Sequence, residues 1–372
     1  MLDYYTNQIL LALLLLVVMT VITLSNSNFN RQTRCGFIVT YMFIIVGALC
    51  EYAGNMCGGK WLIGNEAVDI ALHTTFKVIE LTIVPVIPLV FSRMVFESEI
   101  KKNVFGAVEK LIVAVYIGFE VFSLGKGGLI FSIDEANVFH GEKFYNVYPT
   151  VFVLTSIYMF TNAVRFCRAF QSKKILELTT IVTFIAIGVT MQFANPMAMS
   201  RWLAVAISTA LFFIYYNEVV QYADSLTKLL NQKSYYNYLD SNSEETVAIL
   251  TFDVDDFEQI NGTEGHYFGD VILTKVAMAI KKNYGRYGKC YRIGGDKFAV
   301  ILEKKIANVD TLNASFEEKI RKQKDIDKKF PDISYGIACY NPDNKDTYNL
   351  HDVARESNEN MYKNKKMKKE GV

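Results

Sequence analysis

The chain has 372 residues, 51% of them hydrophobic, with a mean hydropathy of +0.17 and a formal net charge of +1. A net charge so close to zero argues against the strongly basic class of nucleic-acid-binding proteins, so we expect no nucleic-acid partner. The six cysteines form no CxxC pair, which argues against a cysteine-held metal and favours small buried side chains: Cys35, Cys50, Cys57, Cys167, Cys290 and Cys339.

Hydrophobic residues are distributed unevenly along the chain. Up to about Val220, long apolar runs alternate with short polar segments, and beyond it the sequence has the mixed charge of a globular domain. A chain of this length accommodates two or three domains. The change in composition predicts two: a transmembrane sensor domain at 1–220 and a cytoplasmic domain at 221–372.

Seven apolar segments of the first part reach the about 20 residues that a helix needs to cross a bilayer. They are Tyr5–Leu24, Cys35–Ala53, Ala71–Phe91, Phe105–Leu124, Tyr148–Phe166, Leu176–Phe193 and Trp202–Val220. The first has no basic n-region and no small-residue cleavage site after it, so we interpret it as a span and not as a signal peptide. The sequence therefore predicts an all-α transmembrane bundle of about seven helices in contact with membrane lipid.

The loops between these segments differ in charge. Lys and Arg gather in every second loop, at Arg31 and Arg34, at Arg93, Lys101 and Lys102, and at Arg165, Arg168, Lys173 and Lys174. Because positive residues stay on the cytoplasmic side, this pattern predicts a multi-pass protein of the cell membrane with its N-terminus outside. The last span then delivers the C-terminal domain to the cytoplasm.

Three ionisable residues of the third span share one helix face. His73, Lys77 and Glu80 fall at i, i+4 and i+7, and ionisable side chains at membrane depth are costly and usually face the bundle interior. One interpretation is a sensor pocket for an unknown external ligand. The other is a structural Lys77–Glu80 ion pair buried between helices. The outer loop Gly125–Val147 is predicted to form a small hairpin over the bundle mouth.

The seventh span continues to Gln221 without glycine or proline. A helix can therefore pass from the membrane into the cytoplasm unbroken and transmit rotation or dimer geometry to the domain that follows. The alternative is a plain membrane exit.

The C-terminal part alternates strand and helix patterns. We expect a strand at Thr246–Asp253, a short segment with turn residues at Phe257–Tyr267, a helix at Asp270–Asn283, a hairpin of Tyr291–Ile293 and Lys297–Leu302, a helix at Val309–Lys324, a strand at Ile333–Tyr340 and a helix at Leu350–Lys369. The order β-α-α-β-β-α-β-α predicts a sheet with helices on one face, an α/β ferredoxin-like sandwich.

Four segments of this part carry recognisable motifs. They are Asp224–Asn231 (DSLTKLLN), the run from Asp253 to Asp270 (D-x-D-x-F…N…GH…GD), Tyr291–Phe298 (YRIGGDKF), and Ser334–Gly336 with the late Y-x-x-K at Tyr362–Lys365. In this order and spacing they resemble a GGDEF domain of the diguanylate cyclase family, over about Asp224 to Lys369. Any one segment is weak, whereas four in order are specific.

Two carboxylates flank the Gly-Gly turn. Asp253 ends one predicted strand and Asp296 begins another just after Gly294 and Gly295. Antiparallel pairing can place both carboxylates at the same sheet edge, where they repel each other unless a cation lies between them. Hard oxygen ligands beside a nucleotide triphosphate select Mg²⁺ or Mn²⁺. The plain alternative is a strand cap and an ordinary hairpin turn, and the four-segment resemblance favours the metal site.

The resemblance also implies a substrate and residue roles. It implies GTP as substrate, Asp253 and Asp296 as catalytic residues, and a homodimer that brings two GTP molecules together. The residues implied to bind substrate are Asn261 and Asp270 at the guanine edge, Phe257, Gly294 and Gly295, and Lys365 at the phosphates. The alternative for Lys365 is a solvated basic tail, because several further lysines surround it.

The sequence departs from the family pattern at informative positions. The fourth signature position is Lys297 in place of Glu, and a usual phosphate-binding Lys is replaced by Glu258. We interpret the exchange as a charge-reversed ion pair between the two, or as a local supply of positive charge by Lys297. The late A-D pair is Ser357-Asn358, and the inhibitory R-x-x-D is replaced at 285–288, so we expect no product inhibition through that site.

Three functions are compatible with these residues. The first is a membrane-bound diguanylate cyclase that condenses two GTP into cyclic di-GMP under control of the sensor domain. The second is a degenerate GGDEF domain that binds GTP or another nucleotide and signals by assembly. The third is a membrane receptor whose soluble domain only dimerises. Asp253, Asp296, Asn261 and Asp270 favour the first, whereas Lys297 and Glu258 favour the second.

Overall fold

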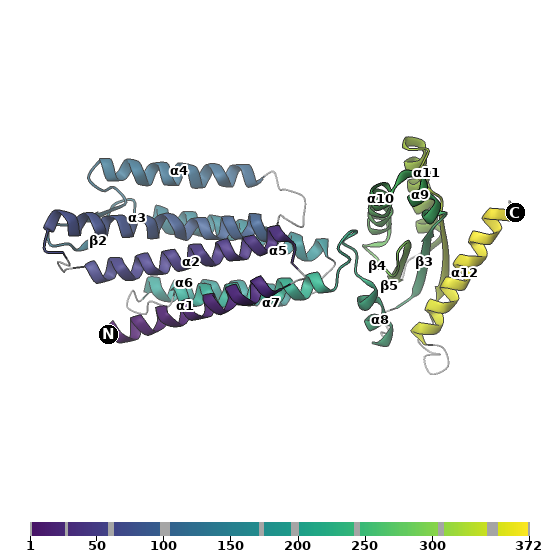
Figure 1. Cartoon of the computed structure of the whole chain (residues 1–372), viewed down its shortest axis with the longest axis horizontal. Coiled ribbons are helices and arrows are strands. Elements are labelled where there is room, and N and C mark those ends of the chain that lie inside the picture. The colour runs from purple at the N-terminus through teal and green to yellow at the C-terminus, as the bar shows by residue number, and fades with distance from the viewer. Residues whose placement is uncertain are drawn as a thin grey trace. The chain divides into compact units, whose positions relative to one another are not determined.

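The structure is a computed structural model of the chain. It describes residues 2–26, 29–58, 63–96, 105–170, 175–194, 201–241, 246–303, 309–340 and 349–370. The chain divides into two compact units, Met1–Glu218 and Val219–Val372 (Figure 1). The predicted domain boundary at 220/221 lies two residues after this division. Lys101, Lys102, Lys173 and Lys174, on which part of the orientation prediction depends, lie outside the described residues.

The first unit is helical. Its helices are α1 (Leu2–Ser25), α2 (Arg31–Cys57), α3 (Glu66–Phe91) with a π-helical turn η1 (Ser92–Phe96), α4 (Phe105–Gly125), α5 (Val147–Ala169), α6 (Ile175–Ala194) and α7 (Arg201–Gln221). Each predicted apolar segment is therefore a helix, and α7 runs unbroken to Gln221 as expected.

Not every helix of this unit is equally apolar. Among the described residues, five helices are long and apolar enough to cross a membrane, namely α1, α2, α3 with η1, α5 and α7. Helix α4 is long enough but carries Glu109, Lys110 and Glu120. In α6 the apolar stretch of described residues is Leu176–Ile185. The helices are compatible with a membrane protein, and the count of seven spans stays a prediction.

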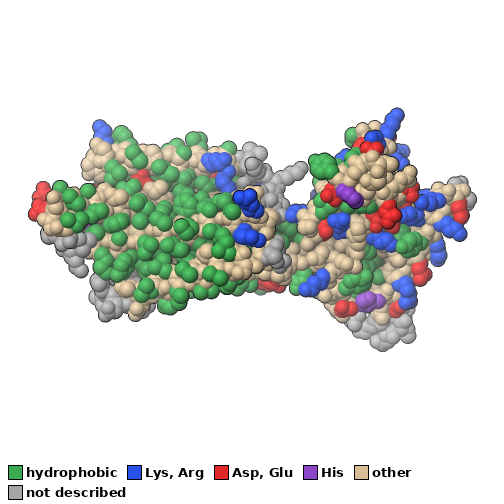
Figure 2. All heavy atoms as spheres, in the orientation of Figure 1, with side chains coloured by type: hydrophobic (Ala, Val, Ile, Leu, Met, Phe, Trp, Pro, Cys, Tyr) green, Lys and Arg blue, Asp and Glu red, His purple; other side chains and the backbone are tan. Residues whose placement is uncertain are grey.

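The surface of this unit is apolar. Hydrophobic side chains cover most of the face that Figure 2 shows, and large ones such as Leu14, Val21, Leu111 and Ile157 are more than half exposed. An apolar surface of this extent would be a liability in water and is compatible with a lipid surrounding.

The predicted hairpin is present in the long loop after α4. Strands β1 (Phe131–Ile133) and β2 (Phe139–Gly141) pair antiparallel. Asp134 accepts backbone hydrogen bonds from Ala136 at 3.0 Å and Val138 at 2.8 Å, which closes the turn between them. Asn137 takes a positive φ of 62° in this turn and is fully buried.

The second unit is built on a four-stranded antiparallel sheet of order β4-β5-β3-β6. Its elements are α8 (Gln232–Asp240), β3 (Ala248–Val254), α9 (Phe257–Glu264), α10 (His266–Tyr284), β4 (Gly288–Arg292), β5 (Lys297–Leu302), α11 (Val309–Ile326), β6 (Ile333–Cys339) and α12 (Leu350–Glu370). The predicted order is confirmed, and α8 is an addition that the sequence analysis missed.

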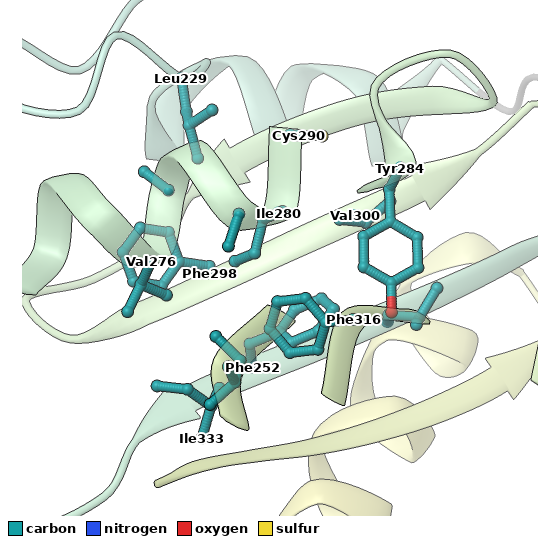
Figure 3. Packing of buried hydrophobic residues seen from close by; sticks show 14 of the residues in the cluster. Leu229, Phe252, Val276, Ile280, Tyr284, Cys290, Phe298, Val300, Phe316 and Ile333 are labelled. Atoms are coloured by element: carbon teal, nitrogen blue, oxygen red, sulfur yellow. The ribbon is translucent and has the colours of Figure 1, made fainter. Parts of the chain in front are cut away.

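Helices cover both faces of this sheet, so the prediction of helices on one face was wrong. Alternate residues of β3 such as Leu250 and Phe252 pack with α10 and α11, where Phe252 and Phe316 rings lie 5.2 Å apart (Figure 3). Ile249 packs on the opposite face with residues of α8 and α12. All seven residues of β3 are buried. A strand buried on both sides reads as a continuous apolar run, and TVAILTF is such a run.

Helix α12 lies unusually close to β6. A Cβ atom added to Gly336 would lie 2.1 Å from the backbone nitrogen of Met361 and 2.4 Å from the carbonyl oxygen of Ser357. Only glycine allows the two backbones to approach in this way. The glycine of the S-x-G motif therefore sets the position of α12, the helix that carries Tyr362 and Lys365.

Candidate functional site

The two predicted metal-binding carboxylates lie at the same edge of the sheet. Asp253, near the end of β3, is paired across the strands with Lys297 of β5 and Ser334 of β6. The backbone nitrogen of Val254 donates to the carbonyl oxygen of Asp296 at 3.2 Å, which holds the two strands together at this point. Asp253 is 3% exposed. Asp296 is half-buried, and no described residue pairs with its carboxylate.

Lys365 is the counter-ion of this edge. It reaches from α12 to an ion pair with Asp253, and its ammonium nitrogen lies 3.7 Å from Oδ1 of Asp255. Burial opposes the charged form, yet the hydrogen bond to Asp253 and the charges of Asp253, Asp255 and Asp296 raise the pKa of Lys365 above its usual value. Lys365 is therefore a cation held among carboxylates, and the solvated-tail alternative does not describe it.

Asp255 belongs to the same cluster, which the sequence analysis did not predict. It is buried, and its Oδ2 accepts a hydrogen bond from the Ser334 hydroxyl at 2.9 Å. Burial raises the pKa of Asp255, against the opposing effects of Ser334 and Lys365. The available signal was the spacing of two residues between Asp253 and Asp255, just past the end of β3, since in extended chain it places both carboxylates on the same face.

Lys297 and Glu258 do not form the ion pair that we hypothesised. The ammonium of Lys297 donates to the Tyr362 hydroxyl at 2.5 Å and lies 4.7 Å from the centre of the Tyr362 ring. Glu258 is exposed in the first turn of α9, and no described residue forms an ion pair with it. The hypothesis was wrong because the contact partner of Lys297 is Tyr362 of α12.

The two glycines of the signature are not needed by the fold itself. A Cβ atom on Gly294 would meet only the Lys297 side chain at an ordinary 3.5 Å, and one on Gly295 would meet nothing within 4 Å. Neither residue takes a positive φ. The turn that contains them is held by Arg292, whose guanidinium donates to the Gly295 carbonyl at 2.7 Å and to Asp224 at 3.2 Å. A braced turn with open space over its backbone is suited to a ligand's close approach.

The predicted guanine-binding residues are also brought together. The side-chain oxygen of Asn261 is buried and has no hydrogen-bond partner among the described residues. It lies against Gly269, where an added Cβ would be 2.0 Å from it, and the exposed Asp270 follows in the chain. Phe257 packs on the core beside them. A buried unpartnered amide oxygen is costly, so it marks a place where a ligand would complete the hydrogen bonds.

The carboxylates fit a hard divalent ion. The described residues hold no group of three or more His, Cys, Asp or Glu side chains arranged as metal ligands. Mg²⁺ at nucleotide sites commonly takes one or two protein carboxylates and completes its shell with water and phosphate oxygens. Asp253 and the unpartnered Asp296 match that requirement, and no particular ion is singled out by them.

A second cluster of ionisable residues lies in the helical unit. Lys77 pairs with Glu80 at 3.0 Å, so the ion pair considered in the sequence analysis is formed. Arg201, at the start of α7, pairs with Glu80 at 2.6 Å and with Glu51 of α2 at 2.5 Å. Its guanidinium also donates to the Tyr148 hydroxyl of α5 at 2.6 Å. Arg201 thus joins its own helix α7 to α2, α3 and α5. The sequence analysis missed Arg201 because it precedes the predicted span by one residue.

The hairpin of the long loop covers this cluster. His73 of α3 is hydrogen-bonded through Nδ1 to the side-chain oxygen of Asn137 at 3.0 Å, and the Asn137 amide donates to the Cys57 carbonyl at 3.0 Å. The Phe139 ring lies 5.3 Å from the ammonium of Lys77. His73, Lys77 and Glu80 are all buried. His73 and Lys77 contact the hairpin, whereas Glu80 pairs with Lys77 and Arg201.

Comparisons with known proteins agree with the motifs. Residues 221–371 match the family described as diguanylate cyclase, GGDEF domain. The probable diguanylate cyclase DgcJ of Escherichia coli (strain K12) is 31% identical over 152 residues, 39% of this chain and 30% of DgcJ. The probable diguanylate cyclase DgcT of the same strain is 22% identical over 286 residues, 68% of this chain and 60% of DgcT.

A solved structure also matches this part of the chain. The GGDEF domain of DgcB from Caulobacter crescentus, crystallised in complex with c-di-GMP, is 24% identical and covers 39% of this chain and 90% of its own, with a TM-score of 0.34.

The C-terminal unit is an α/β domain whose carboxylates and glycines occupy one edge of an antiparallel sheet. Residues 221–371 are a GGDEF domain with diguanylate cyclases among its relatives. The chain spans less than two thirds of the length of either relative, DgcJ or DgcT.

Proposed function

We propose that the protein is a membrane-bound diguanylate cyclase that condenses two GTP into cyclic di-GMP and releases two pyrophosphates. The proposal depends on one observation: where the family match predicts nucleotide-binding residues, the described part of the chain has polar side-chain groups without hydrogen-bond or ion-pair partners. The carboxylate of Asp296 and the buried side-chain oxygen of Asn261 both lack partners among the described residues. Groups of this kind are what a nucleotide with its metal ion would satisfy.

Different residues of the site would bind the metal ion, the phosphates and the guanine base. Asp253 and Asp296 would hold Mg²⁺ or Mn²⁺, which when bound supplies polarisation of the α-phosphate and favours loss of the 3′-hydroxyl proton. Lys365 is placed to neutralise phosphate once it leaves Asp253. Asn261 can accept or donate at a guanine edge, and Asp270 can accept from its N–H groups.

The reaction requires two copies of the chain. Each 3′-oxygen attacks the α-phosphorus of the other GTP, the bond from that phosphorus to the leaving pyrophosphate breaks, and the hydroxyl proton is released. One domain holds one GTP in this scheme, so a homodimer with its two sites facing is needed for turnover. Proximity and orientation of the two substrates would then supply much of the rate.

A second function is favoured by the altered positions. Glu258 is exposed on α9 and would repel phosphate, and Lys297 replaces an acid next to Asp296. A domain altered in this way could bind GTP or another nucleotide without turnover and signal by assembly. Turnover separates this function from the first.

We further propose how the helical unit contributes. All seven helices would span the cell membrane with the N-terminus outside, and the buried cluster of His73, Lys77 and Glu80 would form the sensor site for an external ligand. Arg201 supports this assignment because it joins the cluster to α7, the helix that ends at Gln221 just before the GGDEF domain. The strand order, with α10 and α11 on one face, supports a ferredoxin-like core to which α8 and α12 are added.

Turnover tests the proposal. A fragment from about Asn217 to Val372, dimerised by a fused coiled coil, is incubated with GTP and Mg²⁺ or Mn²⁺, and cyclic di-GMP and pyrophosphate are followed. We expect product that is lost in an Asp296→Ala variant. GTP binding without product would refute the cyclase and favour the nucleotide-binding domain. Neither product nor binding would leave the domain as an assembly element.

A further inference from the structure

The position of Lys297 makes it part of the nucleotide site. Lys297 and Asp253 are direct cross-strand partners in the antiparallel pair of β5 and β3. Side chains directly opposite each other in such a pair point to the same face of the sheet, with Cβ atoms about 5 Å apart. Lys297 therefore shares the face of Asp253 and Lys365, beneath α12. An acid at this position would face Asp253 and could bind a cation with it, whereas a lysine cannot be a metal ligand while it is protonated.

The charge of Lys297 is not used by the fold. No described carboxylate pairs with it, and Asp253 is already neutralised by Lys365. The contacts of its ammonium are the neutral hydroxyl of Tyr362 at 2.5 Å and the face of the same ring at 4.7 Å. A cation–π contact and one hydrogen bond hold an ammonium in place without cancelling its charge. The arrangement is a positioned, uncompensated cation.

The neighbouring charges indicate what this cation would bind. Lys365 lies on α12 three residues after Tyr362. The same helix therefore carries Lys365 and the tyrosine that holds Lys297 of β5, so both lysines lie at the same sheet edge. Glu258, exposed in α9, removes a positive charge from the side of the site where the family has a lysine. A triphosphate entering this edge would therefore find positive charge on α12 and β5 and not on α9.

We propose that Lys297, positioned by Tyr362, is a resident cation that binds the phosphates of GTP and takes over part of the work of a divalent metal. The inference rests on the proposed binding of GTP, and it does not depend on turnover. Its consequence is that GTP binding persists when divalent metal is removed. Tyr362 is a positioning residue in this arrangement, because it acts through Lys297.

The experiment measures GTP binding of the full chain in lipid nanodiscs, with a fluorescent GTP analogue, once with Mg²⁺ and once with EDTA. We expect wild-type affinity in EDTA to stay within about tenfold of that in Mg²⁺. Lys297→Glu should reduce GTP affinity by at least about tenfold more in EDTA than in Mg²⁺. A factor of about ten corresponds to the loss of one charge-assisted contact. Tyr362→Phe keeps the ring but removes the hydroxyl, so we expect a smaller loss of affinity in EDTA.

Lys363→Glu is the matched control. It makes the same charge change on α12, at an exposed lysine with no partner among the described residues, and it should leave the ratio of the two affinities unchanged. Lys297→Met is a second variant, in case Lys297→Glu does not fold, because it adds no repulsive charge. Its GTP affinity should also fall more in EDTA than in Mg²⁺.

Three results would overturn the proposal, with two distinguishable consequences. Wild-type binding that is strong in Mg²⁺ and abolished in EDTA, or an equal effect of Lys297→Glu and Lys363→Glu, removes the resident cation but leaves GTP as the ligand. Absence of GTP binding under both conditions removes the proposed function together with the inference.

Discussion

Replacing Gly336 by alanine tests whether the close packing of α12 on β6 holds the nucleotide site together. The new Cβ atom would lie 2.1 Å from the backbone nitrogen of Met361, whereas ordinary contact begins at 3.4 Å. The difference of 1.3 Å must come from backbone movement, since no flexible side chain is involved. Overpacking of this kind costs about 1–3 kcal/mol, and alanine recovers about 0.5–1 kcal/mol of glycine's backbone entropy. Because backbone atoms must move, we take the upper part of the overpacking range and expect the free energy of unfolding to fall by about 2 kcal/mol.

The measurement is urea unfolding of the Val219–Val372 unit, followed by circular dichroism, together with GTP binding. Because α12 carries Tyr362 and Lys365, its displacement should weaken GTP binding even where most of the protein is folded. The matched control is Gly262→Ala on α9, where an added Cβ meets nothing within 4 Å and φ is not positive. Removing a helical glycine there should raise the free energy of unfolding by up to about 1 kcal/mol.

Equal free energies of unfolding for Gly336→Ala and wild type would refute the reasoning, because they would mean that α12 does not lie against the backbone of β6. If Gly336→Ala lowers stability but leaves GTP affinity unchanged, the packing argument stands and only the dependence of the nucleotide site on α12 is refuted.

Three further predictions concern single sites. Gly269→Ala should push the Asn261 side chain aside and lower GTP affinity about fivefold, the worth of one neutral hydrogen bond, without loss of stability; equal affinity would count against Asn261 as a guanine contact. Asp255→Asn should stabilise the Val219–Val372 unit at pH 7. The folded protein binds a proton on this raised-pKa carboxyl more tightly than the unfolded chain does, so the gain should shrink as pH falls toward the unfolded value of about 3.9; a gain that grows on acidification contradicts the assignment. Arg201→Ala removes the buried cation that Glu51 and Glu80 share and should cost about 3–5 kcal/mol in the full chain, measured as a lower melting temperature in detergent. Adding Glu51→Gln, which leaves the Lys77–Glu80 ion pair intact, should recover part of that loss, and a double variant no more stable than the single one would exclude the buried Glu51 charge as the cause.

Much of the fold could be predicted because the chain obeys simple periodicities. The apolar runs of the first unit are each helical, and the strand and helix order of the second unit is as expected. Two-sided burial of the sheet was missed, although the unbroken apolar run of β3 indicated it. Helix α8 was missed because Gln232–Asp240 is short and polar, and its buried residues Tyr235 and Leu239 are too few to show a period.

That the candidate residues lie together could be predicted, but their side-chain partners could not. Motif spacing placed Asp253 at a strand end and Asp296 at a strand start, and the antiparallel pairing of β3 with β5 brings these two ends together. The partners supplied by α12 depend on long-range packing at Gly336, which no local pattern encodes. For that reason the Lys297–Tyr362 contact replaced the pair expected with Glu258. Arg201 was missed for a related reason, since its partners come from three other helices.

The strand order has a consequence for how the protein is made. Strand β3 lies in the middle of the sheet, but one of its two neighbours, β6, is the last strand of the chain, and α12 follows it. Synthesis proceeds from the N-terminus, so β3 is available long before β6, and its open edge must be protected from other chains during that interval. Pairing over such a sequence distance is also slow. A chain that stops before Leu350 would keep every helix of the first unit but lose Tyr362 and Lys365, so premature termination would remove the residues that α12 supplies to the proposed nucleotide site.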